Sequence, residues 1–547
     1  MMMKIPNKAM FSSMPTAASH LLIGVVLAMG SQVAVADWPQ ANGPSGNFNP
    51  KRYGHRLVDD LSKARKLWVC GDADLGFAKG SSSGYLRHLS EDDTHPGAAS
   101  GLIVAEGKVF ASSFRPSGEI WAEHMPHLKQ DKNRRFAEGD AGAVLRRNAA
   151  IIADDFTVAI DLKTGAIVWK SVEKGKGLNR YSGKRNHFGV SPAYHKGKVF
   201  SLGTSGVIYC YDAEDGDKLW ENADGALVAI AAEERRELLE KRGGFASGDA
   251  MGASLVVAQG VLVVPEFTGG RDIGLRGIDV GSGKTLWTVE AATCRHATPA
   301  VWSHGDRQYL LCATVGQHNR HDSAKLRLID SKDGKVLWTE TGLAATWYPL
   351  SPSADHVMAN VPSAHINPKK AKDGQPWGLM AAYRITPDGA ERAWTMPEKA
   401  PFWFENHMDI CAMRRVLIRD GRVYFFAQGH TVDADKSSRF FSILDEKTGE
   451  VLLTTEAVSG SPQFWLIEDR LLVMPDAAHS GRSTLELFAI DPKGFRRLAE
   501  PWKPPHENTT AYETYMELPY VDGLFLMRNQ QGSVICYDLR AEARKTR

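Results

Sequence analysis

The chain has 547 residues, far more than a single small core requires. Its apolar share of 43% and charged share of 24% are ordinary for a globular protein. The formal charge of only +2 excludes a strongly basic or acidic chain, so it gives no electrostatic argument for nucleic acid or an acidic membrane as a partner.

The N-terminus has the pattern of a secretory signal peptide. Lys4 and Lys8 precede an apolar run at 21–29, and Ala34-Val35-Ala36 then forms an A-x-A cleavage pattern. The apolar run is too short to span a bilayer comfortably, and no cysteine stands at the expected cut to carry a lipid. We expect residues 1–36 to be a signal peptide and 37–547 a single domain. The protein is then periplasmic or secreted, with no membrane span after cleavage.

A hairpin motif recurs along the mature chain. At 207–220 it reads Val-Ile-Tyr-Cys-Tyr-Asp-Ala-Glu-Asp-Gly-Asp-Lys-Leu-Trp. The aspartate starts a turn through its side chain, the glycine takes a positive φ, and alternating apolar residues form two strands with one buried face. The tryptophan offers a large apolar area that can pack against a neighbouring copy. Further copies stand at 158–169, 276–287, 327–338 and 441–453, with looser ones at 383–394, 487–502 and 534–540.

Eight such units predict a β-propeller. The aspartate position is filled by Asp161, Asp212, Asp279, Asp330, Thr386, Asp445, Asp491 and Asp538. The spacing of about 45–70 residues is close to the range of propeller repeats. A second hairpin precedes most motifs, for example with turns at 196–197 and 420–421, so each unit supplies four strands.

The two chain ends carry complementary halves of the motif. Leu67-Trp68 resembles a second half without a first, and 534–539 resembles a first half without a second. Joining them closes a ring and removes exposed strand edges, which a two-sheet sandwich would not explain. We therefore expect an all-β, eight-bladed propeller of four-stranded antiparallel blades, closed by the N- and C-terminal strands, with loop and helical insertions.

The segment 161–169, Asp-Leu-Lys-Thr-Gly-Ala-Ile-Val-Trp, resembles the signature turn of the pyrroloquinoline-quinone-like (PQQ-like) β-propeller superfamily. The opening Asp-Trp-Pro-Gln at 37–40, followed by Gly43-Pro44, is similar to exported bacterial members. The resemblance covers nearly all of the mature chain. It implies the fold more strongly than an activity, because the motif builds blades.

Three insertions interrupt the blades. The first, 115–150, is long and charged, and the third, 361–377, is rich in lysine and proline. The second, 224–244, contains the stretch 230–242, which reads as a helix ended by Gly243-Gly244.

Polar clusters precede several inner strands, on the face where the long loops open. Converging Arg, Asn and His side chains would bind an anionic or polyhydroxylated ligand, an indole offers a stacking surface, and a histidine can act as acid or base. A polar ring around a water-filled channel needs no ligand and stays open as the alternative. The candidate ligand-binding residues are Arg185, Asn186, His187, Arg295, His296, Trp403, Asn406, His407 and Asp409.

Metal and disulfide patterns are weak. His124 with His127 and His318 with His321 have metal-compatible spacing, but neither pair has an evident third ligand, so we predict no metal site. The six cysteines include no C-x-x-C and no adjacent pair, and Cys210 and Cys536 fit strand patterns as small core residues.

Three functions remain open. The first is a non-catalytic binding or scaffold module, whose partner is a small polar or anionic ligand or a cell-envelope protein. The resemblance includes the scaffold subunit of the outer-membrane β-barrel assembly machine. The second is a PQQ-dependent dehydrogenase with PQQ and calcium as cofactors, although the adjacent-cysteine disulfide common in that family is missing. The third is a polysaccharide lyase or hydrolase that uses His, Tyr and Arg of the channel.

Overall fold

In the computed structural model the recurring motifs pair into antiparallel sheets. The structure describes residues 38–542, with gaps at 72–74, 76–99, 117–151, 179–180, 183–184, 187–189, 227–252, 267–271, 295–296, 317–321, 347, 367–375, 397–415, 431–436, 457–462, 475–483, 492–493, 505–517 and 529–532. The blades all belong to one compact unit, Ala36–Arg547.

In every blade the strands lie side by side in chain order from the inner to the outer edge, except that the N-terminal strand forms the outer edge of blade 8. Blade 1 contains β2 (Ile103–Ala105), β3 (Lys108–Pro116), β4 (Ile152–Asp161) and β5 (Ile167–Leu178). Blade 2 contains β8 (Ala193–His195), β9 (Lys198–Leu202), β10 (Ile208–Asp212) and β11 (Lys218–Asn222). Blade 3 contains β12 (Val256–Ala258), β13 (Val261–Pro265), β14 (Asp272–Asp279) and β15 (Thr285–Cys294). Blade 4 contains β16 (Ala300–His304), β17 (Arg307–Ala313), β18 (Ala324–Asp330) and β19 (Val336–Leu343). Blade 5 contains β20 (His356–Ile366), β21 (Pro376–Thr386) and β22 (Gly389–Thr395). Blade 6 contains β23 (Val416–Arg419), β24 (Arg422–His430), β25 (Ser437–Asp445) and β26 (Val451–Glu456). Blade 7 contains β27 (Gln463–Ile467), β28 (Arg470–Met474), β29 (Glu486–Asp491) and β30 (Gly494–Arg497). Blade 8 contains β31 (Tyr520–Val521), β32 (Leu524–Arg528), β33 (Ser533–Asp538) and β1 (Arg65–Gly71).

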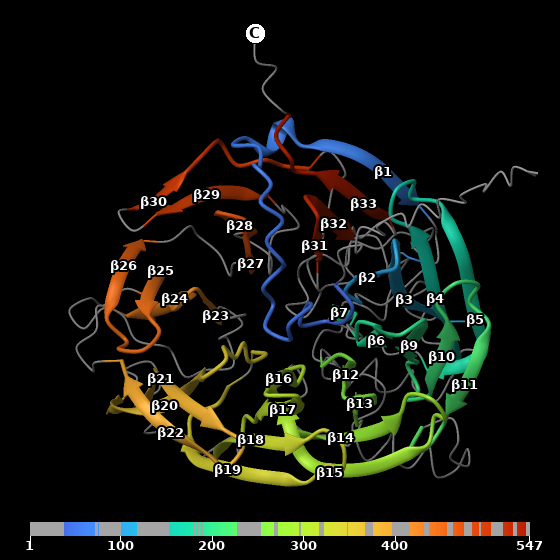
Figure 1. Cartoon of the computed structure of the whole chain (residues 1–547), viewed down its shortest axis with the longest axis horizontal. Helices are drawn as coiled ribbons and strands as arrows, with labels where there is room; N and C mark the ends of the chain where they lie inside the picture. The colour runs from blue at the N-terminus through green and yellow to red at the C-terminus, as the bar shows by residue number, and fades with distance from the viewer. Residues whose placement is uncertain are drawn as a thin grey trace, which may run out of the picture. The chain divides into compact units, whose positions relative to one another are not determined.

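The blades follow one another around a ring in chain order, with their first strands toward the centre (Figure 1). The predicted all-β, eight-bladed propeller of four-stranded antiparallel blades is confirmed. Blade 5 differs, since only three of its strands form a ladder among the described residues. The chain before β20 instead contacts the Asn360 side chain, which donates to the Ala345 carbonyl at 3.0 Å and lies 3.3 Å from the Tyr348 hydroxyl.

The motif turn forms because its own aspartate side chain accepts hydrogen bonds from the backbone N–H groups of the turn. Asp161 Oδ1 accepts from the backbone N–H of Lys163 at 3.1 Å and of Thr164 at 2.7 Å, and also from the Thr164 hydroxyl at 2.7 Å. Gly165 then takes a φ of 75°, which residues with a Cβ rarely adopt. Blade 6 repeats the arrangement with Asp445 and Thr448.

The motif tryptophan joins neighbouring blades, as the sequence predicted. Trp169 of β5 lies under the turn of blade 2, where its Nε1 donates to the Ala213 carbonyl at 3.2 Å. Its ring leaves no room above it, since a Cβ on Gly216 would stand 2.5 Å from Trp169. We call this arrangement the tryptophan lock. The same hydrogen bond is made by Trp68, Trp220, Trp287, Trp338 and Trp394.

The chain ends close the ring. β1 pairs antiparallel with β33, with Trp68 opposite Cys536, so the N-terminal strand completes the blade that the C-terminal strands begin. Asp538 accepts from Arg65 at 2.5 Å and from Arg540 at 2.8 Å. Burial opposes ionisation of Asp538, but the hydrogen bonds from Arg540 and Arg65 outweigh it and lower its pKa to about 2. The carboxylate therefore stays charged and ties both termini together.

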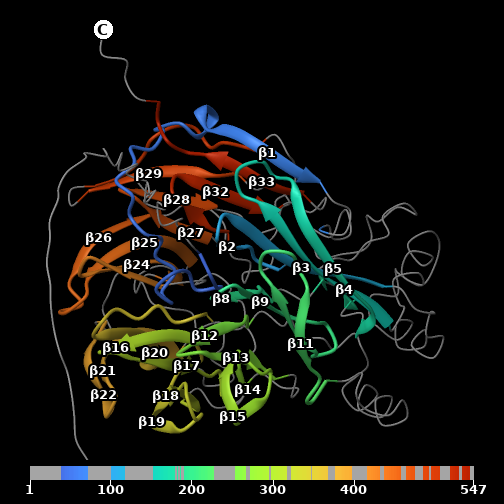
Figure 2. The ribbon, with the colours of Figure 1, turned by 45° about the vertical axis from the view of Figure 1, so that its right-hand side comes forward.

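The segment before β1 crosses the ring, as the blue trace shows in both ribbon views (Figures 1 and 2). We call residues 38–58 the N-terminal strap, which leads into the 3₁₀ helix η1 (Leu61–Lys63). It contacts every blade in order from 1 to 8: Trp38 with Val104, Pro39 with Tyr194, Gln40 with Val257, Asn42 with Pro299, Asn47 with Ser351, Asn49 with Ile418, Gly54 with Glu468 and Val58 with Leu539.

One predicted hairpin is wrong in detail. The looser motif at 487–502 was expected to end on Trp502, but β30 ends at Arg497. Arg496 pairs with Ala489 and so takes the tryptophan position, whereas Trp502 forms an isolated bridge with Leu485. The reason is a shorter turn, because Gly494 follows Asp491 by one residue fewer than in the full motif.

The insertions are described only in part. The second insertion's predicted helix at 230–242 and most of the first insertion lie outside the described residues. The third is shorter than expected, since β20 and β21 extend into it as far as the pair Ile366 and Pro376. No helix in the described part of the chain is long and apolar enough to cross a lipid bilayer. Cys210 and Cys536 are buried strand residues, as predicted.

Candidate functional site

The structure places only two of the candidate ligand-binding residues. Arg185 and Asn186 form the short strand β7 (Arg185–Asn186), which pairs with β6 (Tyr181–Ser182) in the crossing from blade 1 to blade 2. Their side chains are not described. The remaining candidates, His187, Arg295, His296, Trp403, Asn406, His407 and Asp409, and both His-x-x-His pairs lie outside the described residues. The ligand site therefore stays a prediction.

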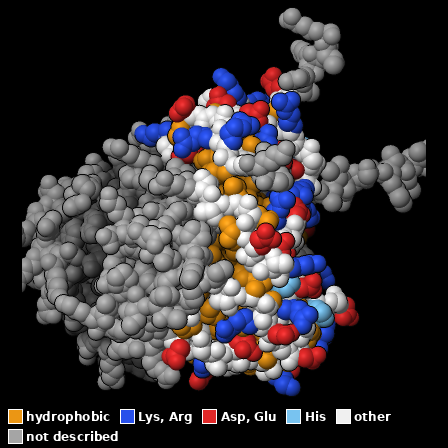
Figure 3. Space-filling view, turned by 90° about the vertical axis from the view of Figure 1, so that its left-hand side faces the viewer, with side chains coloured by type: hydrophobic (Ala, Val, Ile, Leu, Met, Phe, Trp, Pro, Cys, Tyr) orange, Lys and Arg blue, Asp and Glu red, His pale blue; other side chains and the backbone are white. Residues whose placement is uncertain are grey.

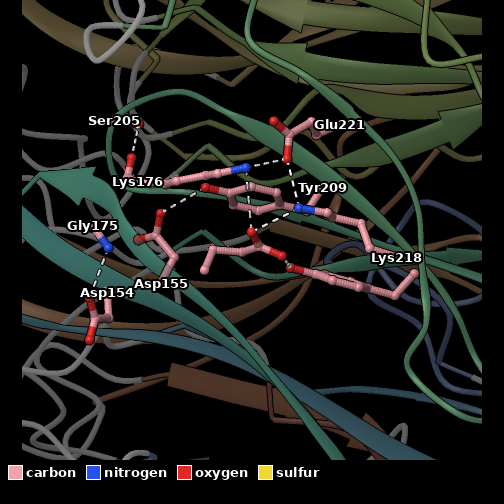
Figure 4. Close-up of polar contacts among 10 residues, drawn as sticks. Asp154, Asp155, Gly175, Lys176, Ser205, Tyr209, Lys218 and Glu221 are labelled. Atoms are coloured by element: carbon pink, nitrogen blue, oxygen red, sulfur yellow. Dashed lines mark hydrogen bonds and ion pairs between the residues drawn. The ribbon is translucent and has the colours of Figure 1, made fainter.

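A buried polar cluster does lie between blades 1 and 2 (Figure 4). Its centre is Asp155 of β4, whose Oδ1 accepts from the Thr204 N–H at 3.1 Å and the Thr204 hydroxyl at 2.8 Å. Its Oδ2 accepts from the Tyr209 hydroxyl at 3.3 Å. Gly177 leaves space for the carboxylate, since a Cβ there would stand 2.6 Å from Oδ1. The Asp155 carboxylate of blade 1 thus accepts hydrogen bonds from a loop and from a strand of blade 2.

An outer shell of ion pairs covers this cluster. Glu173 of β5 accepts from the Tyr211 hydroxyl at 3.2 Å and from Lys218 at 2.9 Å. Glu221 accepts from Lys176 at 2.5 Å and from Lys218 at 2.8 Å, and these hydrogen bonds lower its pKa. The two lysines and Glu221 are partly exposed, so each contact contributes little by itself, but the four charges form a network.

Burial sets the protonation of the inner groups. It raises the pKa of Asp155 to about 6, although hydrogen bonds from Thr204 and Tyr209 pull in the other direction. It also raises the pKa of Tyr209 and of Tyr211, so both phenols keep their protons and act as donors. Asp155 is only 5% exposed and its carboxylate accepts from donors of the next blade, so this part of the cluster joins blades 1 and 2.

A second acid repeats the arrangement. Asp272 of β14 accepts from the Val315 N–H at 2.7 Å and the Gly316 N–H at 3.0 Å, in the loop that follows β17 of blade 4. Burial raises its pKa too. The sequence interpretation missed both acids. Their signal is an aspartate six or seven residues before the motif aspartate, at the start of the third strand.

Replacing Asp155 with asparagine should remove part of the pH dependence of stability. The pKa is 3.8 in the reference state and about 6 in the fold, so the neutral acid is favoured by folding. Its contribution is fully present below 3.8 and is lost as the pH rises through about 6. We expect Asp155→Asn to abolish this loss, measured as the free energy of unfolding in urea across this range.

Asp161→Asn is the control of opposite sign, because the Thr164 hydrogen bond lowers the pKa of Asp161. Its contribution is present at neutral pH and is lost as the pH falls. Equal pH profiles for wild type and Asp155→Asn would contradict the prediction.

Hydroxyl groups link the blades just before their inner strands. The Ser191 N–H donates to the Ser254 hydroxyl at 2.9 Å, and the Ser254 N–H donates to the Thr298 hydroxyl at 2.9 Å. Each of these residues stands two positions before an inner strand. A serine or threonine at this position, followed by proline in Ser191-Pro192 and Thr298-Pro299, is the sequence signal that could have found them.

A fully buried arginine spans blades 8 and 1. Arg528 of β32 is 0% exposed, and its guanidinium donates to the Leu75 carbonyl at 2.7 Å, the Ser100 hydroxyl at 2.6 Å and the Ser112 carbonyl at 3.1 Å. Burial lowers its pKa to about 9. The described partners that stabilise this charge are carbonyl oxygens and the Ser100 hydroxyl, so Arg528 holds the closing blade against its neighbour.

The sheet topology and the repeated lock together define an eight-bladed β-propeller, and the comparisons agree with the resemblance to PQQ-like propellers that the sequence predicted. Residues 154–346 match the model of the family described as outer membrane protein assembly factor BamB. Comparison with curated proteins gives no match.

Solved structures show the same fold. The quinohemoprotein alcohol dehydrogenase from Comamonas testosteroni is 10% identical with a TM-score of 0.50, over 94% of this chain and 82% of that one. At that identity the likeness shows the fold alone. BamB from Moraxella catarrhalis is 12% identical over 71% of this chain and 90% of that one, and its TM-score of 0.43 gives it no further weight.

Proposed function

We propose that the protein is an exported, non-catalytic binding or scaffold module of the cell envelope, with a polar ligand pocket at the channel mouth. The observation that carries the proposal is the match of 154–346 to a family described as an outer membrane assembly factor. The geometry supports it, because the buried acids Asp155 and Asp272 are engaged in joining blades. The expected signal peptide places such a module in the periplasm or outside the cell.

The outer strands offer a surface for a protein partner. Leu219 of β11 is 46% exposed, Leu286 of β15 is 50% exposed and Leu452 of β26 is 44% exposed. Figure 3 shows a band of apolar side chains on the side of the ring that carries β25 and β26. Apolar residues exposed on several outer strands are more typical of a protein contact than of a catalytic site.

The PQQ-dependent dehydrogenase is a second candidate, because a dehydrogenase shares the fold. When bound, PQQ would accept electrons from an alcohol and calcium would assist it. Among the residues that the structure describes, no group of three or more His, Cys, Asp and Glu side chains gathers to hold an ion. The described residues therefore supply no cluster of carboxylates for calcium. The polysaccharide lyase or hydrolase rests on the aromatic and His-rich channel mouth alone, where His187 and His407 are the positions to test.

A cross-linking experiment tests the scaffold. We expect a photoreactive residue at Leu219 of the full chain, in cells that export it, to cross-link to an outer-membrane assembly protein. The same residue at the exposed Lys332, in the turn after β18, should not. Adducts at both positions, or at neither, would count against a specific partner on the outer strands.

Enzyme assays test the alternatives. With PQQ, calcium and an alcohol, we expect no dye reduction, and with envelope polysaccharides no released product. Turnover of alcohol would replace the proposal with the dehydrogenase. Turnover of glycan that His187→Ala and His407→Ala abolish, with unchanged thermal stability, would replace it with the lyase or hydrolase.

A further inference from the structure

Two seams between neighbouring blades carry no tryptophan lock in the described part of the chain. Trp169 pairs with Ala159, two residues before the motif aspartate Asp161. The equivalent residue of blade 6 is Leu453, which pairs with Ile443. The equivalent residue of blade 7 is Arg496. The seams between blades 6 and 7 and between blades 7 and 8 therefore lack a tryptophan at the lock position. At the 7–8 seam other indoles make edge-on contacts instead, with Trp465 5.5 Å from Phe525 and Trp502 5.0 Å from Tyr537 between ring centroids.

The N-terminal strap places apolar side chains at these two seams. Phe48 is 1% exposed and belongs to an apolar cluster of blades 6 and 7 that includes Phe426 and Phe464. Farther along, Leu57 and Val58 are 1% and 9% exposed in a cluster of blades 7 and 8, together with Leu61 of η1. At the 6–7 seam a stack of Phe441 on Phe495 also contributes, with ring centroids 4.6 Å apart.

Hydrogen bonds fasten the strap at the same place. Asn49 donates to the Ile418 carbonyl of blade 6 at 2.9 Å. Glu468 of blade 7 accepts from the backbone N–H of Tyr53 at 3.0 Å and of Gly54 at 3.1 Å. The Tyr520 hydroxyl of blade 8 donates to the same carboxylate at 3.2 Å. One short stretch of strap thus binds three consecutive blades.

The rest of the strap differs in kind. Gln40 accepts from the Val257 N–H of blade 3 at 2.8 Å, and Asn42 donates to the Pro299 carbonyl before β16 at 2.9 Å. Those contacts are polar and lie where Trp220 and Trp287 provide locks. Trp38 and Ala41 are buried apolar residues of this part, and Trp38 anchors the start of the strap to β2.

We propose that the strap residues Phe48, Leu57 and Val58, with Leu61, hold blades 6, 7 and 8 together in place of the missing tryptophan locks. The strap is then a clamp on one sector of the ring, and its release opens the ring at those seams first. This inference stands independently of any ligand or partner.

Hydrogen exchange of the full chain, read by mass spectrometry, tests the clamp. Phe48→Ala removes the side chain at the 6–7 seam. We expect exchange in β24, β26 and β27 to speed up by about tenfold or more, while β10 and β11 of blade 2 keep the wild-type rate. Phe48→Leu should give a smaller change at the same strands, and it keeps the test available if the alanine variant does not fold.

Gln40→Ala is the matched control, because it removes a strap contact at a locked seam. It should alter exchange only near β12. Trp169→Ala should speed amide hydrogen exchange in the strands of blades 1 and 2 and leave the exchange rates of blades 6 and 7 unchanged. The proposal is overturned if Phe48→Ala and Phe48→Leu leave β24 to β27 unchanged, or if they loosen all blades equally.

Discussion

Trp68→Ala is expected to lower the free energy of unfolding by about 3–5 kcal/mol, one of the largest single-residue losses in the chain. Trp68 is 7% exposed although it lies on an outer strand. Its Nε1 donates to the Leu162 carbonyl at 2.9 Å, and its ring lies 2.6 Å from where a Cβ on Gly165 would stand. The side chain therefore joins the last blade to the first, and its strand belongs to the last blade only through the pairing of β1 with β33.

Leu67→Ala provides the control on the same strand. Leu67 is 41% exposed, so its loss should change stability by about 0.5 kcal/mol or less. Urea titrations followed by circular dichroism would measure both variants. Similar losses for the two, or a small loss for Trp68→Ala, would show that ring closure does not depend on the indole.

Much of this fold could be predicted because each blade repeats a local solution. Asp161, Thr164 and Gly165 complete their turn with their own atoms, so the pattern is visible in sequence without knowledge of its neighbours. The half motifs at Trp68 and Asp538 likewise predicted their pairing, because an unpaired half of a hairpin needs a partner.

Contacts made across the ring could not be predicted in the same way. The strap segment reads only as a turn-rich lead-in, since Asn49 and Gly54 meet partners more than 300 residues away. Asp155 is hidden for a related reason, because its three donors come from the next blade's Thr204 and Tyr209. The candidate ligand residues stand on long loops, where neither strand alternation nor turn chemistry fixes a position.

The strongest test of the lock as a repeated device is a pair of glycines in blade 2. Gly197 and Gly216 have nearly the same backbone, with φ of 77° and 80°. Among the described residues nothing lies within 4 Å of a Cβ on Gly197, whereas a Cβ on Gly216 would stand 2.5 Å from Trp169. We expect Gly197→Ala to cost about 1–2 kcal/mol from backbone strain alone. Gly216→Ala should cost about 1–3 kcal/mol more, because the indole must also move.

A double-mutant cycle then assigns the extra loss to its cause. Trp169→Ala alone should cost about 3–5 kcal/mol. Once the indole is gone, the added methyl of Gly216→Ala meets no ring, so its cost in that background should fall to that of Gly197→Ala. The coupling energy, taken from urea unfolding of the four chains, should then be about 1–3 kcal/mol. Additive losses would mean that the glycine is required for its φ alone, and that the motif does not need it to make room for the neighbouring indole.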